Sequence, residues 1–397
     1  MDTILASAVK VDITPYLIHE TYLAGFGPNR LATGVLDPLT ARILFLEDEN
    51  GPAVWISLDL IGFLLGDVDT LRSRLRGIAP ERILVCSTHT HAGPDTIGLW
   101  GPTVGGVPIK NGRDPEYIKW LIDQVVAGVR RARGRRRPAV IGFGEDAGDK
   151  SEWTLNIRQP GYNDQSMGIM RVDTVDGRPI ACLTNYACHP EILWDMNTKI
   201  SPDYVHYLHK AVEDATGAVS IFMNGALGGM ITSVLDDDTG YSDRRRFYRN
   251  MGRAFGEIAA ATWEQIRPTT IKEIVHRHQR RWFPVDNKQF TFMANLGVFQ
   301  REFRRNEIET RIDFWQIGSA QFVTLPGEPL PSVGFAAKDL LTGDPAFLFG
   351  LGNDELGYLV SDREADDPRY AYERSMSVGP DATNLFLETI DSLVRAK

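Results

Sequence analysis

The sequence predicts an α/β fold in which mixed β-sheets are covered by helices. Two observations lead to this prediction. Apolar strand-like runs recur along the 397-residue chain, and amphipathic helical stretches lie between many of them. The composition, with 43% hydrophobic and 24% charged residues, is typical of a soluble globular protein. We also expect a seam between two subdomains near 267–271, inside the segment "QIRPTTIK".

The expected elements follow in chain order. Strand-like runs lie at 39–48, 53–63, 82–88, 139–145, 167–174, 180–188, 218–225, 271–283, 311–326 and 346–353. Helical patterns lie at 67–77, 114–133, 203–215, 242–266 and 331–341. In the second of these, Pro115 suits the first helical turn, and Ile118, Leu121 and Val125 repeat on one stripe. The runs 271–283 and 311–326 look antiparallel, so we expect mixed sheets.

Charge and cysteine content limit the partners and the compartment. The net charge of −9 argues against nucleic acid, and the basic stretch 130–137 is better explained as the cationic end of a helix. Three cysteines make no disulfide framework, which suits a reducing cytosol. The N-terminal segment has no signal-peptide pattern, and no apolar run approaches the length of a membrane helix. We therefore predict a cytoplasmic protein without an integral membrane segment or a nucleic-acid partner.

The segment "STHTHAGPDT", Ser87–Thr96, carries the first candidate site. His89 and His91 follow the buried run "RILVC" and precede the breakers Gly93 and Pro94. On a strand, residues i and i+2 point to the same face, so both histidines can face one pocket. Imidazole is a usual zinc ligand. The alternative is two histidines that pack beside a turn.

Two further residues occur in similar settings. His189 directly follows another apolar run and is followed by Pro190, and Glu328 lies in the rigid turn "LPGEPLP". A catalytic zinc site needs three protein ligands and an open position, and histidine with glutamate is a frequent combination. A second pair, His276 and His278, is flanked by arginines, and we interpret it as an exposed strand face.

Taken in order, these segments resemble the neutral ceramidase family. The similar segments are "STHTHAGPD", "NYACHPEI", "LPGEP", "GLGNDELGYLVS" and "YERSMSVGP", and the likeness runs from about Lys10 to the C-terminus. The resemblance implies one catalytic domain over 1–397. It also implies a set of zinc ligands and a set of catalytic pocket residues. The ligands are His89, His189, Glu328 and Tyr358, and the pocket residues are His91, Arg158 and Tyr372.

Two departures from the family pattern concern size and substrate. Full-length ceramidases carry a C-terminal immunoglobulin-like domain, and we expect none in this chain of 397 residues. In "FMNGALGGMITS", 222–233, Ala226, Gly229 and Ile231 replace the family's Asn, Asp and Ser. Because that serine is implicated in the family's catalysis, we expect a different substrate from ceramide.

The resulting expectation is a zinc-dependent hydrolase that cleaves an amide (N-acyl) bond of a small molecule by metal-activated water. Esterase, lactonase or lyase chemistry on the same scaffold, or a non-catalytic binding protein, are the alternatives. The His-x-His patterns of amidohydrolase barrels and metallo-β-lactamases fit less well. Asp203 is either an acceptor that orients His189 or a helix N-cap, and the loop 98–108 with Trp100 is expected to line the pocket. A homo-oligomer is left open.

Overall fold

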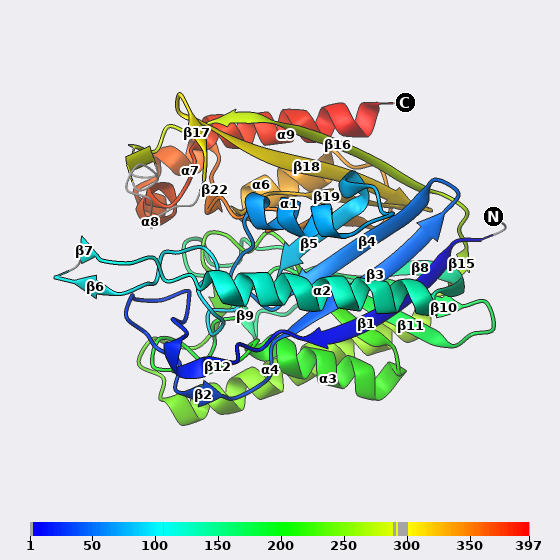
Figure 1. The fold of residues 1–397 in the computed structure, drawn as a ribbon, viewed down its shortest axis with the longest axis horizontal. Coiled ribbons are helices and arrows are strands. Elements are labelled where there is room, and N and C mark those ends of the chain that lie inside the picture. The colour runs from blue at the N-terminus through cyan, green and yellow to red at the C-terminus, as the bar shows by residue number, and fades with distance from the viewer. Residues whose placement is uncertain (1–2, 106, 289–290, 293–300, 397) are drawn as a thin grey trace.

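Four layers build the protein: helices, a first β-sheet, a second β-sheet and further helices (Figure 1). The computed structural model describes residues 3–105, 107–288, 291–292 and 301–396. The predicted class, α/β with mixed sheets covered by helices, is confirmed.

The first sheet has the strand order β13-β11-β10-β8-β1-β3-β4-β5. Its strands are β1 (Leu5–Asp12), β3 (Thr40–Asp48), β4 (Gly51–Leu58), β5 (Ile83–Ser87), β8 (Arg137–Asp146), β10 (Met167–Thr174), β11 (Pro179–Tyr186) and β13 (Val219–Asn224), and β15 (Thr269–Thr270) also pairs with β8. The pairs β4–β5 and β11–β13 are parallel, while the other pairs along this order are antiparallel. Each parallel pair is joined through a crossover that contains a helix, as parallel pairing requires.

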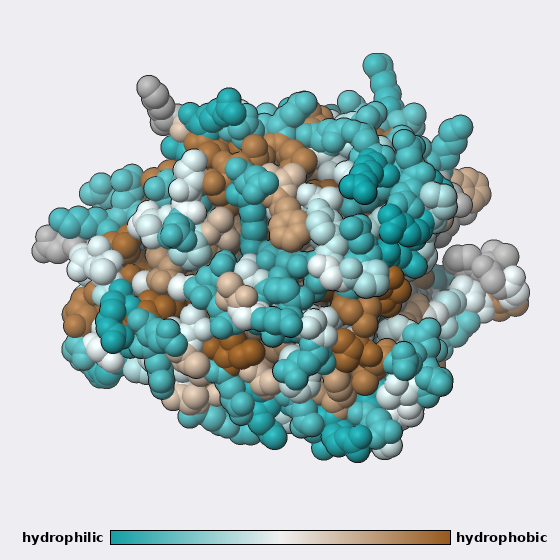
Figure 2. Space-filling model, turned by 180° about the vertical axis from the view of Figure 1, so that it is seen from behind, coloured by the Kyte–Doolittle hydropathy of each residue, from teal (hydrophilic) through white to brown (hydrophobic). Residues whose placement is uncertain are grey.

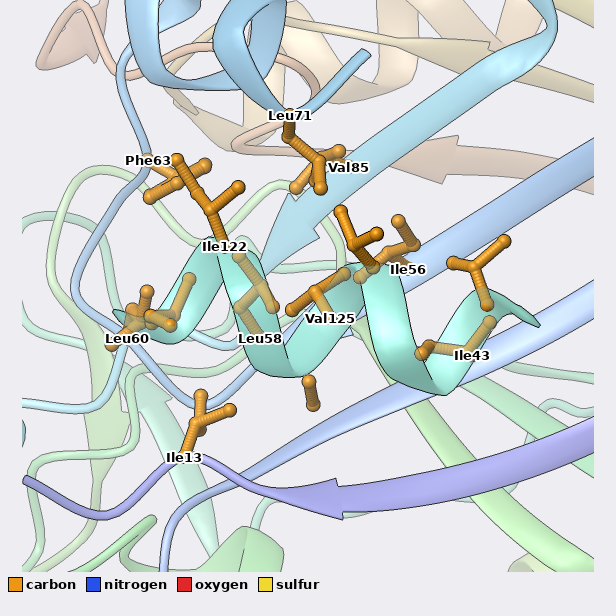
Figure 3. Packing of buried hydrophobic residues seen from close by; sticks show 14 of the residues in the cluster. Ile13, Ile43, Ile56, Leu58, Leu60, Phe63, Leu71, Val85, Ile122 and Val125 are labelled. Atoms are coloured by element: carbon orange, nitrogen blue, oxygen red, sulfur yellow. The ribbon is translucent and has the colours of Figure 1, made fainter. Parts of the chain in front are cut away.

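Helices cover the outer face of this sheet. They are α1 (Leu65–Arg74), α2 (Pro115–Arg135), α3 (Tyr204–Thr216) and α4 (Tyr241–Gln265). In Figure 3, Ile122 and Val125 of α2 lie over Ile56 and Leu58 of β4, as expected from the apolar stripe of this helix. The helix begins at Asp114, whose carboxylate accepts the Glu116 N–H at 2.9 Å.

The second sheet packs against the inner face of the first. It contains β16 (Ile274–Pro284), β18 (Glu307–Ile317), β19 (Ala320–Thr324) and β21 (Ala346–Phe349) in this order, with β17 (Phe303–Arg304) beside β18. Between the sheets, the ring of Trp55 lies 5.6 Å from Trp315, 5.0 Å from Phe322 and 5.7 Å from Phe349, between ring centroids. Helices α6 (Pro331–Asp339) and α9 (Pro380–Arg395) cover the other face.

Short elements complete the fold. They are β2 (Gly34–Val35), β6 (Thr103–Val104), β7 (Val107–Pro108), β9 (Thr154–Asn156), β12 (Lys199–Ile200), β14 (Ile231–Ser233), β20 (Glu328–Pro329), β22 (Tyr358–Leu359), α7 (Asp362–Asp366), α8 (Ala371–Ser375) and the 3₁₀ turns η1 (Ile18–Glu20), η2 (Pro80–Arg82) and η3 (Pro368–Tyr370). The chain passes from the first sheet to the second after β15. The single domain over 1–397 and the seam near 267–271 stay predictions.

Two local expectations are corrected by the structure. The run 311–326 contains two strands, because Gly318, at φ +57°, turns the chain between β18 and β19. The pair His276 and His278 is not an exposed face as a whole. His276 donates to the Asp313 carboxylate at 2.6 Å and stacks on Trp315, so only His278 is exposed.

No helix in the described part of the chain is both long and apolar enough to cross a membrane. On the face turned away in Figure 1, apolar and polar side chains are interspersed (Figure 2).

Candidate metal centre

His89, His189 and Glu328 meet at one end of the two sheets. His89 follows β5, His189 follows β11, and Glu328 begins β20 shortly after β19. Asn224, at the end of β13, donates two hydrogen bonds of 3.0 Å to the carbonyls of the residues that precede the two histidines. This amide therefore ties the two histidine segments together.

Backbone carbonyls fix the tautomers of both imidazoles. The Nδ1 atoms of His89 and His189 lie 2.6 Å from the Ile61 carbonyl and 2.9 Å from the Ile231 carbonyl. Because a carbonyl oxygen only accepts, each Nδ1 carries the hydrogen and a neutral ring has its lone pair on Nε2. The two Nε2 atoms lie 3.4 Å and 3.0 Å from Oε2 of Glu328.

Three electron-pair donors thus face one another, and this arrangement needs a cation or extra protons. Ligands about 2.0–2.1 Å from a tetrahedral zinc ion stand about 3.3 Å apart, close to the separations observed. Burial raises the pKa of Glu328, but the neighbouring His89 and His189 outweigh it and lower this pKa far below its usual range. Burial lowers the pKa of His189, yet the carboxylates of Glu191 and Glu328 raise it to about 9. The donor set fits a zinc ion.

His91 lies in the same cluster. One ligand atom from each of His89, His91 and His189 can be chosen so that all lie within 4.8 Å of one another. The Nδ1 atom of His91 lies 3.1 Å from Oε2 of the buried Glu191. Burial, together with the two neighbouring imidazoles, lowers the pKa of His91 well below its ordinary value, so this ring is neutral. It can serve as a proton acceptor or as a third imidazole ligand.

The two histidines share a pocket for a different reason than strand alternation. Strand β5 ends at Ser87, and His89 has a left-handed backbone with φ +72°. Trp194 and Met230, which line the outer part of the same pocket, also have positive φ, at +63° and +59°. Residues other than glycine rarely adopt a positive φ angle, and backbone strain of this kind is concentrated at functional sites. The strand-based argument is therefore wrong in its geometry, although both rings do face one cluster.

The two predicted tyrosines lie at the edge of this cluster. Strands β20 and β22 pair Glu328 with Tyr358, so the tyrosine is the cross-strand neighbour of the carboxylate. The Tyr358 hydroxyl lies 3.6 Å from Sδ of Met230, and its ring lies 5.9 Å from the Tyr372 ring. Burial and the charge of Glu328 raise the pKa of Tyr358 well above its usual value. Tyr372 is half exposed and lines the pocket.

Arg158 belongs to a neighbouring ion pair. Its Nε donates to the buried carboxylate of Glu373 at 2.7 Å. Glu373 follows Tyr372 in the chain, so the pair supports the segment that carries this tyrosine. Among the described residues, the pocket lining includes Tyr372 but not Arg158.

Asp203 is the N-cap of α3 and does not orient His189. Its carboxylate accepts the N–H groups of Tyr204 at 2.7 Å and Leu193 at 2.9 Å. The Ile231 carbonyl, and not Asp203, is the hydrogen-bond acceptor that orients the His189 ring.

A cavity opens above the candidate ligands. Its deep part is lined by His89, His91 and Glu328, and an outer part shares His91 and Tyr372 with it. The loop 98–108 contributes Leu99 and Trp100 to both parts, as predicted, and Phe26 and Trp194 line the outer part. Sequence reasoning missed two buried carboxylates at this cavity, Glu191 and Glu355. The signal was available, since Glu191 stands two residues after His189 and Glu355 stands three residues before Tyr358.

Comparison with known proteins identifies the fold. No family model matches the chain. The crystal structure of neutral ceramidase from Pseudomonas aeruginosa superposes with a TM-score of 0.77, covering 99% of this chain and 75% of that one at 17% identity. The chain has a neutral ceramidase-like fold. A ceramidase complexed with C2 gives a TM-score of 0.74 at 16% identity, with the same coverage.

A curated relative supports the same fold. Neutral ceramidase A of Dictyostelium discoideum is 24% identical over 220 residues. This match covers 48% of the present chain and 29% of the relative, so less than a third of that protein's length is compared. The neutral ceramidase-like fold extends through the chain, whereas the sequence match to this relative covers about half of it.

Proposed function

We propose that this chain is a zinc-dependent hydrolase that cleaves an amide (N-acyl) bond of a small molecule other than ceramide. The observation that carries the proposal is the convergence of His89, His189 and Glu328, with fixed imidazole tautomers, at the floor of a cavity on a ceramidase-like fold. In the proposal these three residues and Tyr358 hold the zinc ion.

When bound, zinc lowers the pKa of water to near 7 and polarises a carbonyl oxygen. In the proposal, the neutral His91 accepts a proton from the attacking water at Nε2 and passes it to the leaving amine, while the Glu191 carboxylate lies 3.1 Å from Nδ1. The Tyr372 hydroxyl donates a hydrogen bond to the developing oxyanion. Arg158 acts through Glu373 and positions the tyrosine segment.

The proposal excludes ceramide because of the segment around Ile231. The side chains that the family pattern places there are replaced, and what remains is the Ile231 carbonyl that fixes His189. The cavity around the candidate ligands has a mostly apolar wall with a few polar groups, as small-molecule sites do. The cytoplasmic location and the lack of a nucleic-acid partner stay predictions, and a homo-oligomer stays open.

The test combines metal content with activity. We expect about one zinc per chain by elemental analysis, and hydrolysis of at least one member of a panel of short N-acyl compounds. His89→Ala and His189→Ala should lose both zinc and hydrolysis, while His19→Ala, an exposed control, should keep both. Protein without stoichiometric zinc, or full activity in the two site variants, would show that the proposal is wrong.

A further inference from the structure

Glu355 is a buried carboxylate in the deep cavity that the proposed zinc chemistry does not use. Only 7% of the residue is exposed, and it lines the same cavity as His89 and Glu328. Its Oε1 accepts the Gly357 N–H at 2.8 Å. Its Oε2 has no hydrogen-bond partner within the described ranges of the chain. A buried polar atom left unpaired costs about 1–3 kcal/mol, so such an atom calls for a ligand.

The fold holds this side chain in place. A Cβ atom at Gly62 would come within 2.7 Å of Cγ and 2.8 Å of Cβ of Glu355, so the glutamate lies directly against bare backbone. The surrounding cavity wall is mostly apolar, with Ile61, Ile97 and Leu356. Glu355 is therefore a rigid polar point on an apolar surface.

Burial and two neighbouring charges act on the pKa of Glu355 in opposite directions. Burial raises its pKa well above the usual value, Glu328 raises it further, and Arg301 opposes the shift. Arg301 also pairs with Asp354, so its charge is shared. A hydroxyl group can donate to an ionised carboxylate and can accept from a protonated one, so a hydroxyl suits Glu355 in either state.

We propose that Glu355 is a specificity-determining residue that binds a hydroxyl group on the part of the substrate that enters the deep cavity. This inference rests on the proposed function, because it takes the scissile bond to lie at the candidate zinc ligands. The substrate class is then N-acyl compounds with a compact, hydroxyl-bearing group on the side that faces Glu355. A site built to bind a hydroxyl rejects the methyl analogue strongly, since the analogue leaves the carboxyl unpaired.

The test uses zinc-loaded protein and hydroxamic acids, which bind zinc through their two oxygen atoms. Butanohydroxamic acid and 3-hydroxypropanohydroxamic acid differ only in a terminal methyl group that is replaced by a hydroxyl group. Pairs with longer chains place this exchange farther from the zinc-binding hydroxamate group. We expect calorimetry to show that at least one hydroxyl member binds about tenfold or more tightly than its methyl partner. Glu355→Gln should keep much of this preference, and Glu355→Leu should remove it. Thermal melting checks that both variants fold.

Two outcomes overturn the inference: no hydroxyl preference in the wild type, including no binding of either member, and an unchanged preference in folded Glu355→Leu. The failures are distinguishable. If the hydroxyl preference depends on Glu355 but no N-acyl compound is hydrolysed, the proposed hydrolase reaction is wrong and the proposed hydroxyl-binding site is supported. If hydrolysis is found without any preference, only the binding inference falls.

Discussion

Single-atom contacts decide where the His91 ring can lie. Gly25 has φ +98°, and a Cβ atom there would lie 2.3 Å from Cγ and 2.5 Å from Nδ1 of His91. Arg30 adds a second restraint, because its guanidinium donates to the His91 carbonyl. The ring is therefore held between bare backbone and Glu191, which is 3.1 Å from its Nδ1.

Replacing this glycine should disturb the site and the fold together. We expect Gly25→Ala to lower the free energy of unfolding by about 1–3 kcal/mol, because the new methyl group meets the ring and the backbone conformation is strained. Equilibrium urea unfolding measures the change. Gly27→Ala is the matched control, since a Cβ atom there meets nothing within 4 Å, and it should stay within about 0.5 kcal/mol of the wild type. Equal losses in both variants would contradict the proposed contact.

At the residue scale, the sequence indicates the metal donors better than their partners. His89, His189 and Glu328 stand at breaks after apolar runs, a context visible in the letters alone. Their Nδ1 partners are the carbonyls of Ile61 and Ile231, and a backbone carbonyl has no sequence signature. A sequence shows side chains such as that of Asp203 as possible acceptors for His189, but it does not show which backbone carbonyl will lie beside the ring.

Helix boundaries illustrate what local rules achieve at the scale of the element. The prediction 114–133 matches α2, Pro115–Arg135, because a capping aspartate, a proline at the first turn and an apolar stripe agree. The run 311–326 was predicted as one strand because its apolar residues continue across the turn at Gly318. The sequence patterns do not predict strand β1 or helix α9. In the structure β1 pairs with β3, and α9 packs on the second sheet.

The N-cap of α2 offers a measurable test of this local reasoning. We expect Asp114→Ala to destabilise the protein by about 1 kcal/mol, because the Glu116 N–H loses its acceptor. Asp114→Ser is the control, since a serine hydroxyl can accept the same hydrogen bond, and it should stay close to the wild type. Denaturant unfolding of the three proteins gives the comparison. An alanine variant as stable as the serine variant would mean that the cap contributes nothing.

On the scale of the whole molecule, the candidate site joins segments that are far apart in the chain. His89 and His189 follow two strands of the first sheet, and Glu328 comes from the segment after the second sheet's β19. The first sheet curls so that β13 lies against β3 and β4, where Arg42 and Ser57 donate to the carbonyls of Ser220 and Phe222, and this brings the two histidine segments together. The packing of the second sheet on the first adds Glu328. No periodicity in the sequence specifies that arrangement. The letters indicate His89, His189 and Glu328 as separate candidates, and the family resemblance adds Tyr358 and joins the four into one ligand set.

A cation bound at this point should therefore stabilise the whole fold. Zinc that binds the folded chain and not the unfolded one adds about 2.7 kcal/mol when its free concentration is a hundredfold above Kd. We expect a chelator to lower the Tm of the protein as purified, and added zinc to restore it. His189→Ala should lose this zinc-dependent increment, and His19→Ala should keep it. The increment is the quantity to compare, because His189→Ala also removes the hydrogen bond to Ile231 and lowers the Tm without metal. An equal increment in His189→Ala would place the zinc at another site.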